Sequence, residues 1–426
     1  MKLKKIAVLL VLAGAAAPVF ATNGYFAHGY GMKAKGMGGA ATAVTGDTFG
    51  GANNPATMVW AGNRMDVGVD LFMPKRSASR QGNPGAAGDG SVESDSNEFL
   101  VPEFGYNKML NSNMSAGVTV YGNGGMNTDF PATGSAGPNN LLLGSGRLGV
   151  DLMQLIIAPT LSYKLNANHS VGISPLFGFQ RFKVDGLSAF TPLSSSSGDV
   201  TNKGDDDSTG WGVRIGWFGK LSDTVSLGAA YSSRMRMSAF DQYKGLFAEG
   251  GDFDIPENYN FGIAVKATPS TTVAFDIQQI NYADVKSIAN PVANSLRGLG
   301  ATYALGTANG SGFAWRDMTV FKLGVEHEYS KNLVVRAGYN YGKSPVRGGT
   351  IDDVTFNIIA PAVVEHHLTL GATLTLADKS ELTVSYMHAF SNSVTGPSAT
   401  SLLGQGGNET LKMKQDSIGI AYGIKY

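Results

Sequence analysis

The sequence predicts an all-β protein, a transmembrane antiparallel β-barrel of about fourteen strands with an N-terminal hatch inside the lumen. Apolar residues alternate with small or polar residues in successive segments of about ten residues, as in strands that cross a membrane. The connections between these segments alternate between tight turns and long polar loops. Charged residues make up only 15% of the chain, against about 25% in soluble domains.

The chain begins with a predicted secretory signal peptide, residues 1–21. Lys2, Lys4 and Lys5 form a basic start, residues 6–17 are apolar, and Val19-Phe20-Ala21 provides small residues for cleavage. The apolar run is shorter than the ~20 residues that a membrane-spanning helix needs. We therefore expect this segment to be removed, so that the mature chain begins near Thr22.

Residues 22–62 form the predicted hatch. This segment is rich in glycine and alanine, shows no strand alternation, and ends near Asn54-Pro55-Ala56. Small residues allow close packing against other backbone but bury too little apolar surface to form a core. The segment is therefore expected to be held inside a larger structure.

Residues 63–426 form the predicted barrel. In residues 211–218 and 259–266, large apolar side chains occupy every second position, which places them on one face of a strand. Tight turns are expected around Asn111-Ser112-Asn113 and at five later positions, namely 166–169, 222–224, 269–271, 330–332 and 377–380. Long loops are expected at 77–96, 123–149, 184–208, 238–255, 286–312, 344–361 and 391–408. Short turns on one side and long loops on the other match the periplasmic and extracellular ends of a closed barrel.

The alternative is a soluble β-sandwich, whose apolar faces would point inward. In that fold, the placement of all the long polar loops at one end would be a coincidence. Aromatic residues at both ends of the segments, including Trp211, Trp217 and Tyr422, instead fit the girdles of a membrane barrel.

If the apolar side chains face lipid, the alternate positions place charged side chains of both signs in the lumen. These charges either hydrate the lumen and anchor the hatch, or include a cation that meets the carboxylate of a ligand. Arg214 and Arg336 are the first candidates for such a cation.

Two of the long loops carry unusually many large apolar residues. Such surface often marks an interaction site, and the functional interpretation is an outward-facing groove that collects hydrophobic molecules. The alternative is that the two loops pack on each other. The candidate ligand-binding residues in these loops are Met126, Phe130, Leu141, Leu142, Leu143, Phe240 and Phe247.

Composition and motifs argue against several other functions. The 33 basic and 33 acidic residues give a formal net charge of zero, which gives no electrostatic support for a nucleic-acid partner. The absence of cysteine excludes disulfides and cysteine nucleophiles. No Gly-x-Ser-x-Gly elbow is present, and His366 and His367 would point to opposite faces of a strand. We therefore expect neither catalysis nor a metal or cofactor.

The chain resembles the FadL family of outer-membrane transporters for hydrophobic compounds. The resemblance is carried by residues 29–40, GYGMKAKGMGGA, by the triplet Asn54, Pro55 and Ala56 ahead of the first strand, and by the terminal Tyr426. It implies a monomeric fourteen-stranded barrel in the bacterial outer membrane, in contact with outer-membrane lipid and lipopolysaccharide and inserted by the barrel-assembly machinery. A kinked third strand, here Met114–Tyr121 followed by glycines, would open a lateral path into the membrane.

We therefore expect passive uptake of hydrophobic compounds, in the first place long-chain fatty acids, with hatch rearrangement and lateral release. Ligand would pass from the outer groove to a pocket beside the hatch, lined by Thr22, Asn23, Gly24, Tyr25 and Phe26. The alternatives are uptake of aromatic hydrocarbons by the same route, a general porin, and a structural surface barrel. A general porin would conduct ions readily, whereas a barrel closed by a hatch would be almost silent.

Overall fold

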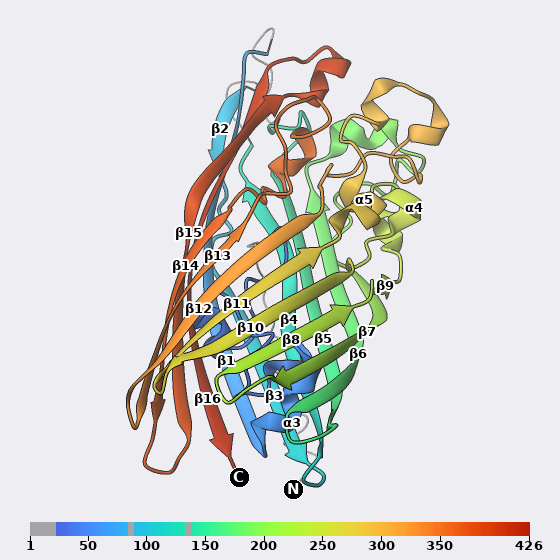
Figure 1. Ribbon diagram of the computed structural model, residues 1–426. Coiled ribbons are helices and arrows are strands. Elements are labelled where there is room, and N and C mark those ends of the chain that lie inside the picture. Colours follow the sequence, from blue (N-terminus) through green and yellow to red (C-terminus); the bar gives the residue numbers. More distant parts are fainter. Residues whose placement is uncertain (1–22, 84–88, 133–138) are drawn as a thin grey trace, which may run out of the picture.

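The computed structural model describes residues 23–83, 89–132 and 139–426. The predicted signal peptide and Thr22 lie outside the described residues. The described residues form sixteen strands in a single sheet, of which β2 and β9 are short additions beside β1 and β7. The other fourteen pair antiparallel with their neighbours, and β16 pairs back onto β1, so the barrel is closed (Figure 1). The prediction of a fourteen-stranded antiparallel barrel is confirmed.

The described strands vary in length from two to eighteen residues. Their bounds are β1 Arg64–Gln81, β2 Gly90–Glu93, β3 Phe99–Met109, β4 Met114–Phe130, β5 Leu148–Lys164, β6 His169–Asp185, β7 Asp206–Lys220, β8 Val225–Ser232, β9 Arg236–Met237, β10 Asn258–Thr268, β11 Thr271–Ile280, β12 Met318–Ser330, β13 Leu333–Gly342, β14 His366–Thr375, β15 Glu381–Pro397 and β16 Asn408–Lys425.

The alternation of side chains sorts each strand into an outer and an inner face. Large apolar residues such as Trp211, Phe261 and Ile418 are more than half exposed on the outside of the wall. The intervening positions point into the lumen, where Arg214 and Asp276 are almost fully buried. This arrangement is what a barrel in lipid requires, because apolar side chains face the hydrocarbon and polar side chains face the protein interior.

The connections follow the predicted alternation. Tight turns join β3 to β4, β5 to β6, β7 to β8, β10 to β11, β12 to β13 and β14 to β15, and long connections lie at the opposite end of the barrel (Figure 1). Three predicted loops begin too early, because β1 runs to Gln81, β4 to Phe130 and β15 to Pro397. These upper strand ends carry polar residues on both faces, so they lack the apolar alternation that marks the rest of each strand.

The N-terminal segment, residues 23–62, lies inside the barrel, where its blue ribbon occupies the half nearer the tight turns (Figure 1). It folds as short helical turns joined by irregular chain. These are α2 Met32–Gly36, η1 Phe49–Gly51, η2 Pro55–Thr57 and α3 Met58–Ala61. Because few of its backbone groups pair with each other, the segment depends on hydrogen bonds to inward-facing side chains of the wall.

Those inward-facing side chains come from strands all around the barrel. Asp276 on β11 accepts hydrogen bonds from the backbone N–H groups of Ala41 and Thr42, both at 2.9 Å. Asp66 on β1 accepts from the backbone N–H of Thr48 at 3.1 Å. The wall carboxylates therefore satisfy amide groups that would otherwise be buried without partners.

The extracellular connections contain the other short helices of the described residues. These are η4 Ser188–Leu193, η5 Asp241–Tyr243, α4 Ala248–Gly251, η6 Tyr282–Asp284, α5 Lys286–Ala289, η7 Ser295–Arg297, η8 Ala301–Tyr303, η9 Thr355–Ile358 and η10 Ala399–Leu403. Their apolar residues join one buried cluster with the upper lumen. Within the described residues, no helix is both long and apolar enough to cross a membrane.

Candidate functional site

The third strand of the wall, β4, is irregular where it meets the beginning of the N-terminal segment. Its pairing with β5 shifts register between Gly122 and Gly124, leaving Asn123 as an extra residue in the strand. The backbone N–H of Ala27 donates to the carbonyl oxygen of Asn123 at 3.1 Å, and Gly125 donates to the carbonyl oxygen of Tyr25 at 3.2 Å. The bulge thus frees backbone groups that bind the N-terminal segment.

Glycine is required at position 124 for this contact. A Cβ atom built on Gly124 would lie 1.7 Å from the carbonyl oxygen of Tyr25, a distance that no real contact allows. The run of glycines that the sequence analysis noted after Tyr121 therefore lets two backbones approach closely.

An aromatic cluster surrounds the same contact. Tyr25 and Phe26, which sequence analysis placed in a ligand pocket, are both buried and pack against Tyr282, with ring centroids 5.2 Å and 5.9 Å from its ring. The Tyr282 hydroxyl donates to the carbonyl oxygen of Asn23 at 2.6 Å. Trp315 packs edge-on to Tyr282 at 5.2 Å. The structure thus brings Asn23, Gly24, Tyr25 and Phe26 together between β4 and the extracellular connections.

The Asn54-Pro55-Ala56 triplet fixes the other end of the segment. The side chain of Asn54 caps η2 by accepting from the N–H of Ala56 at 3.1 Å, and it donates to the carbonyl oxygen of Trp217 at 2.9 Å. The hydroxyl of Ser170 donates to the carbonyl oxygen of Ala56 at 2.7 Å. A Cβ at Gly216 would lie 2.0 Å from the Asn54 side-chain oxygen, so the wall is thinned there to accept the triplet.

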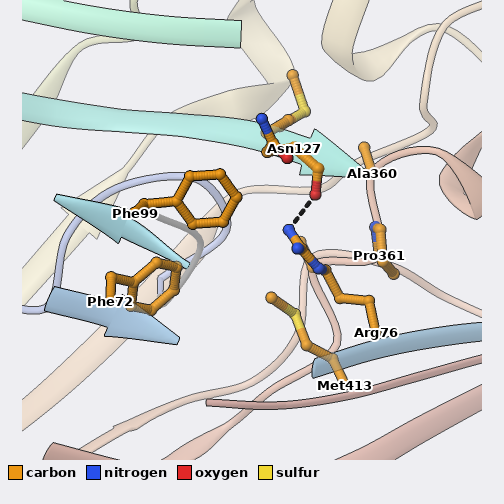
Figure 2. A pocket seen from close by; sticks show the side chains of 9 residues that line it. Phe72, Arg76, Phe99, Asn127, Ala360, Pro361 and Met413 are labelled. Carbon is orange, nitrogen blue, oxygen red and sulfur yellow. Dashed lines mark hydrogen bonds between the residues drawn. The ribbon is translucent and has the colours of Figure 1, made fainter. Parts of the chain in front are cut away.

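A pocket lies on the lumen side of β1, β3 and β4, and we call it the Arg76 pocket (Figure 2). Phe72 and Phe99 lie on one side of the Arg76 guanidinium, and Asn127 faces it on another. The free volume is about 10 Å³, close to that of one water molecule. The lining residues are Phe72, Arg76, Phe99, Met126, Asn127, Ala360, Pro361, Ala362 and Met413.

Among the described residues, Arg76 is the one charged residue that lines this pocket, and it is 5% exposed. Its guanidinium donates to the backbone carbonyl oxygens of Asn127 and Ser96 and lies 5.6 Å from the Phe99 ring. No carboxylate pairs with it among the described residues. By contrast, the buried Arg80, which is the second inward-facing residue beyond Arg76 on β1, pairs with Glu409. Burial of a cation without a counter-ion is costly, so such a group is a strong candidate for binding an anion.

The two cations that sequence analysis favoured have other partners. Arg214 donates to the carbonyl oxygen of Ala52 and, at 3.1 Å, to the side-chain oxygen of Asn258, so it holds the N-terminal segment. Arg336 pairs with Glu326 at 2.7 Å, near the turn end of the barrel. Neither residue lines the Arg76 pocket.

Sequence analysis missed Arg76 because the upper part of β1 shows no apolar alternation. A signal was nevertheless present. Arg64, Asp66 and Asp70 point inward from the same strand, and residue 76 has the same parity. Continuing that register through the polar part of the strand would have placed Arg76 in the lumen.

The wall itself is interrupted beside the pocket. Pairing between β3 and β4 runs from Met109–Ser115 to Phe104–Val120 and, among the described residues, does not continue above that pair. Further up, the backbone N–H of Asp95 donates to the carbonyl oxygen of Asp129 at 2.9 Å. Between these points, β3 residues 99–103 and β4 residues 121–126 do not pair with each other, and we call this stretch the β3–β4 break. It includes the bulge at Asn123 and the pocket residues Phe99 and Met126.

The candidate loop residues are placed as follows. Met126 and Phe130 belong to β4, and only Met126 lines the Arg76 pocket. Phe240 and Phe247 are buried and pack together with Phe182, with ring centroids 5.4 Å and 4.7 Å from its ring. Leu141 and Leu142 are buried in the same apolar cluster, and Leu143 adopts a positive φ of 63° in the turn that follows.

A narrow crevice of about 20 Å³ remains among the extracellular connections. It is lined by side chains from residues 246–247, 287–313 and 356–359, together with Phe182 and Leu187, and residues 123–149 do not contribute to it. Residues of both loops belong to one packed apolar cluster over the lumen, which we call the lid, and the crevice lies within it.

The lid contains a carboxyl group that titrates near neutral pH. Burial, with the nearby charge of Asp254, raises the pKa of Asp252 to about 7, although Arg234 lies 3.5 Å away. A carboxyl with a raised pKa in the folded state stabilises that state least when it is ionised. The lid should therefore be most stable in acid and lose stability as pH rises through about 7.

We expect amide exchange in residues 248–255 to accelerate between pH 6 and pH 8, after correction for intrinsic rates, and Asp252→Asn to remove that change. Equal pH dependence in the variant would contradict this assignment.

The geometry defines a class of protein: an outer-membrane barrel whose lumen holds its own N-terminal segment and which contains small cavities lined largely by apolar side chains. The chain belongs to the outer membrane protein transport protein family (OMPP1/FadL/TodX), whose model matches residues 8–426. It is thus an outer-membrane transporter of hydrophobic compounds, and the family consists of transport channels. Comparison with curated protein sequences gives no match.

Solved structures share the fold at low sequence identity. The toluene transporter TodX of Pseudomonas putida is 18% identical with a TM-score of 0.67, covering 94% of this chain and 99% of that chain. A Pseudomonas aeruginosa FadL homologue is 16% identical with a TM-score of 0.67, covering 96% and 99%. The toluene transporter TbuX of Ralstonia pickettii is 15% identical with a TM-score of 0.64, covering 94% and 99%.

Proposed function

We propose that this protein takes up long-chain fatty acids, and that Arg76 binds the carboxylate. The observation that carries this proposal is the buried guanidinium in a pocket otherwise lined by apolar residues and Asn127, with no carboxylate partner among the described residues. Arginine presents a planar fork of donors that matches a carboxylate. The rings of Phe72 and Phe99, with Met126 and Met413, would receive the first methylene groups of the chain.

We further propose a passive route from the crevice in the lid to the Arg76 pocket, and then through the β3–β4 break into the membrane. The free volume of the pocket is too small for a fatty acid, so its walls must move when ligand enters. The N-terminal segment, residues 23–62, is the proposed hatch, and its contact with the bulge at Asn123 makes it the element whose movement would open the pocket. Burial of the chain, at about 25 cal/mol per Å², would supply the driving force without an energy source or catalysis.

The second candidate is uptake of aromatic hydrocarbons by the same route. The structural neighbours TodX and TbuX are described as toluene transporters, and the aromatic cluster around Tyr25 would suit a flat apolar ligand. A neutral hydrocarbon would leave the Arg76 guanidinium without an anion, which is why we favour the fatty acid.

Competition binding to the purified wild-type protein tests the choice. A fluorescent fatty acid bound in detergent would be displaced by palmitate, by hexadecanol of equal chain length, or by toluene. We expect palmitate to compete roughly 10- to 100-fold better than hexadecanol, because a charged hydrogen bond contributes about 1.5–3 kcal/mol. Equal competition by the alcohol would reject the carboxylate site, and stronger competition by toluene would favour the aromatic route. Ready ion conduction in planar bilayers would instead indicate a general porin.

A further inference from the structure

A group of outward-facing lysines lies at the outer edge of the apolar band. Along β16 the outward positions Ile420 and Ile418 are exposed and apolar, and Asp416, Lys414 and Lys412 follow toward the extracellular end. On the neighbouring β1, Leu71 and Met73 are followed by Lys75. The apolar face therefore gives way to charged residues at nearly the same height on both strands, where the hydrocarbon of the outer leaflet gives way to its headgroups.

The register between the two strands brings two of these lysines together. Lys75 lies directly opposite Lys414, and Lys412 lies opposite Ser77. Like charges at directly opposed positions destabilise a sheet, and among the described residues none of the three lysines forms an ion pair. Two carboxylates are near: Glu93 lines the same cavity, and Asp416 receives hydrogen bonds from Tyr386 and from the ring of His388. The local excess of positive charge is thus left for an anion from outside the chain.

A cavity of about 530 Å³ opens between these side chains, by far larger than the crevice or the Arg76 pocket. Besides Lys75, Lys412 and Lys414, it is lined by hydroxyl and amide groups that can donate to an anion, namely Ser77, Ser94, Asn97 and Ser391. Arg76, Glu93 and Met413 complete the lining. Ammonium groups with neighbouring hydroxyls suit a phosphate group, and each lysine near a membrane surface contributes about 1 kcal/mol to binding an anionic lipid.

We propose that this cavity binds the phosphorylated headgroup of an anionic glycolipid of the outer leaflet. The acyl chains of the lipid would lie along the apolar band formed by residues such as Leu71 and Ile418. The phosphate would neutralise the opposed pair Lys75 and Lys414. The three lysines lie on the outside of the wall, whereas Arg76 and Met413 line both this cavity and the Arg76 pocket.

The test uses the full mature barrel in detergent and a fluorescent, bisphosphorylated lipid A as the probe. The variant Lys75→Gln/Lys412→Gln/Lys414→Gln should bind this probe roughly 10- to 100-fold more weakly than wild type. The matched control Lys266→Gln/Lys331→Gln/Lys379→Gln removes the same charge from exposed positions at the turn end of the barrel and should leave binding unchanged. Heat-modified mobility of both variants on gels reports whether the barrels are folded.

Two further measurements identify the source of the phosphate. Fully dephosphorylated lipid A should bind wild type as weakly as the triple variant binds the probe, and millimolar inorganic phosphate should displace the probe poorly. Equal binding of the two lipids, equal loss in the control variant, or displacement by inorganic phosphate at micromolar concentration would overturn the proposal. None of these outcomes depends on fatty-acid transport, which is measured independently.

Discussion

Replacement of Arg76 by glutamine should abolish the preference for a fatty acid over the corresponding alcohol. The variant keeps a polar side chain of similar length but loses the charge and the fork of donors that we assign to the carboxylate. Palmitate binding should weaken roughly 10- to 100-fold, whereas hexadecanol binding should change little. The measurement is the ratio of the two dissociation constants in the competition assay with the fluorescent fatty acid.

Two variants make this result specific. Arg214→Gln removes the other buried arginine that lacks a carboxylate partner among the described residues, but its contacts are with the N-terminal segment, so the ratio should remain that of wild type. Arg76→Lys keeps the charge without the fork and should give an intermediate ratio. A wild-type ratio in Arg76→Gln, or its loss in Arg214→Gln, would move the carboxylate site away from the Arg76 pocket.

Loss of the Lys35 ammonium should release the N-terminal segment from the wall. Lys35 lies in α2, is almost fully buried, and pairs with Asp70 at 2.8 Å and with Glu103 at 3.6 Å. In Lys35→Met, two buried carboxylates would be left without their cation, and breaking such a group typically costs about 3–5 kcal/mol. We expect the ion conductance of the barrel in planar bilayers to be low in the wild type and to rise in Lys35→Met.

The adjacent lysine provides a matched control. Lys33 pairs with Glu381 at 2.7 Å, but that carboxylate also pairs with Arg64 at 2.8 Å and with Lys425 at 2.7 Å. Lys33→Met should therefore have little effect on conductance. Neutralising the partners as well, in Lys35→Met/Asp70→Asn/Glu103→Gln, should restore much of the seal. If Lys35→Met conducted no more than wild type, the buried ion group would not be what holds the segment in place.

Much of the wall could be predicted because it obeys a simple rule. Where a strand lies between lipid and lumen, its side chains alternate, and the tight turns interrupt that alternation at a regular spacing. The rule fails where the strands leave the membrane. There, Arg76 and Lys75 are both polar although they face opposite sides of β1, so periodicity alone could not distinguish the lumen from the surface.

The interior was harder to predict because its contacts are remote in sequence. The glycines after Tyr121 suggested an irregular strand, but the position of the bulge depends on the carbonyl oxygen of Tyr25, which no local pattern reveals. Likewise, the roles of Arg214 and Arg336 are decided by partners on other elements, Ala52 in one case and Glu326 in the other.

The distribution of partners around the N-terminal segment has a consequence for biogenesis. The amide of Gly38 donates to Thr369 on β14, and Lys33 pairs with Glu381 on β15, more than 300 residues further along the chain. Contacts between such distant parts of a chain form late, because the intervening chain must first be ordered. The residues that leave the ribosome early therefore reach their final position only after the last hairpins are in place. The N-terminal segment can therefore close the lumen only after the barrel wall is complete.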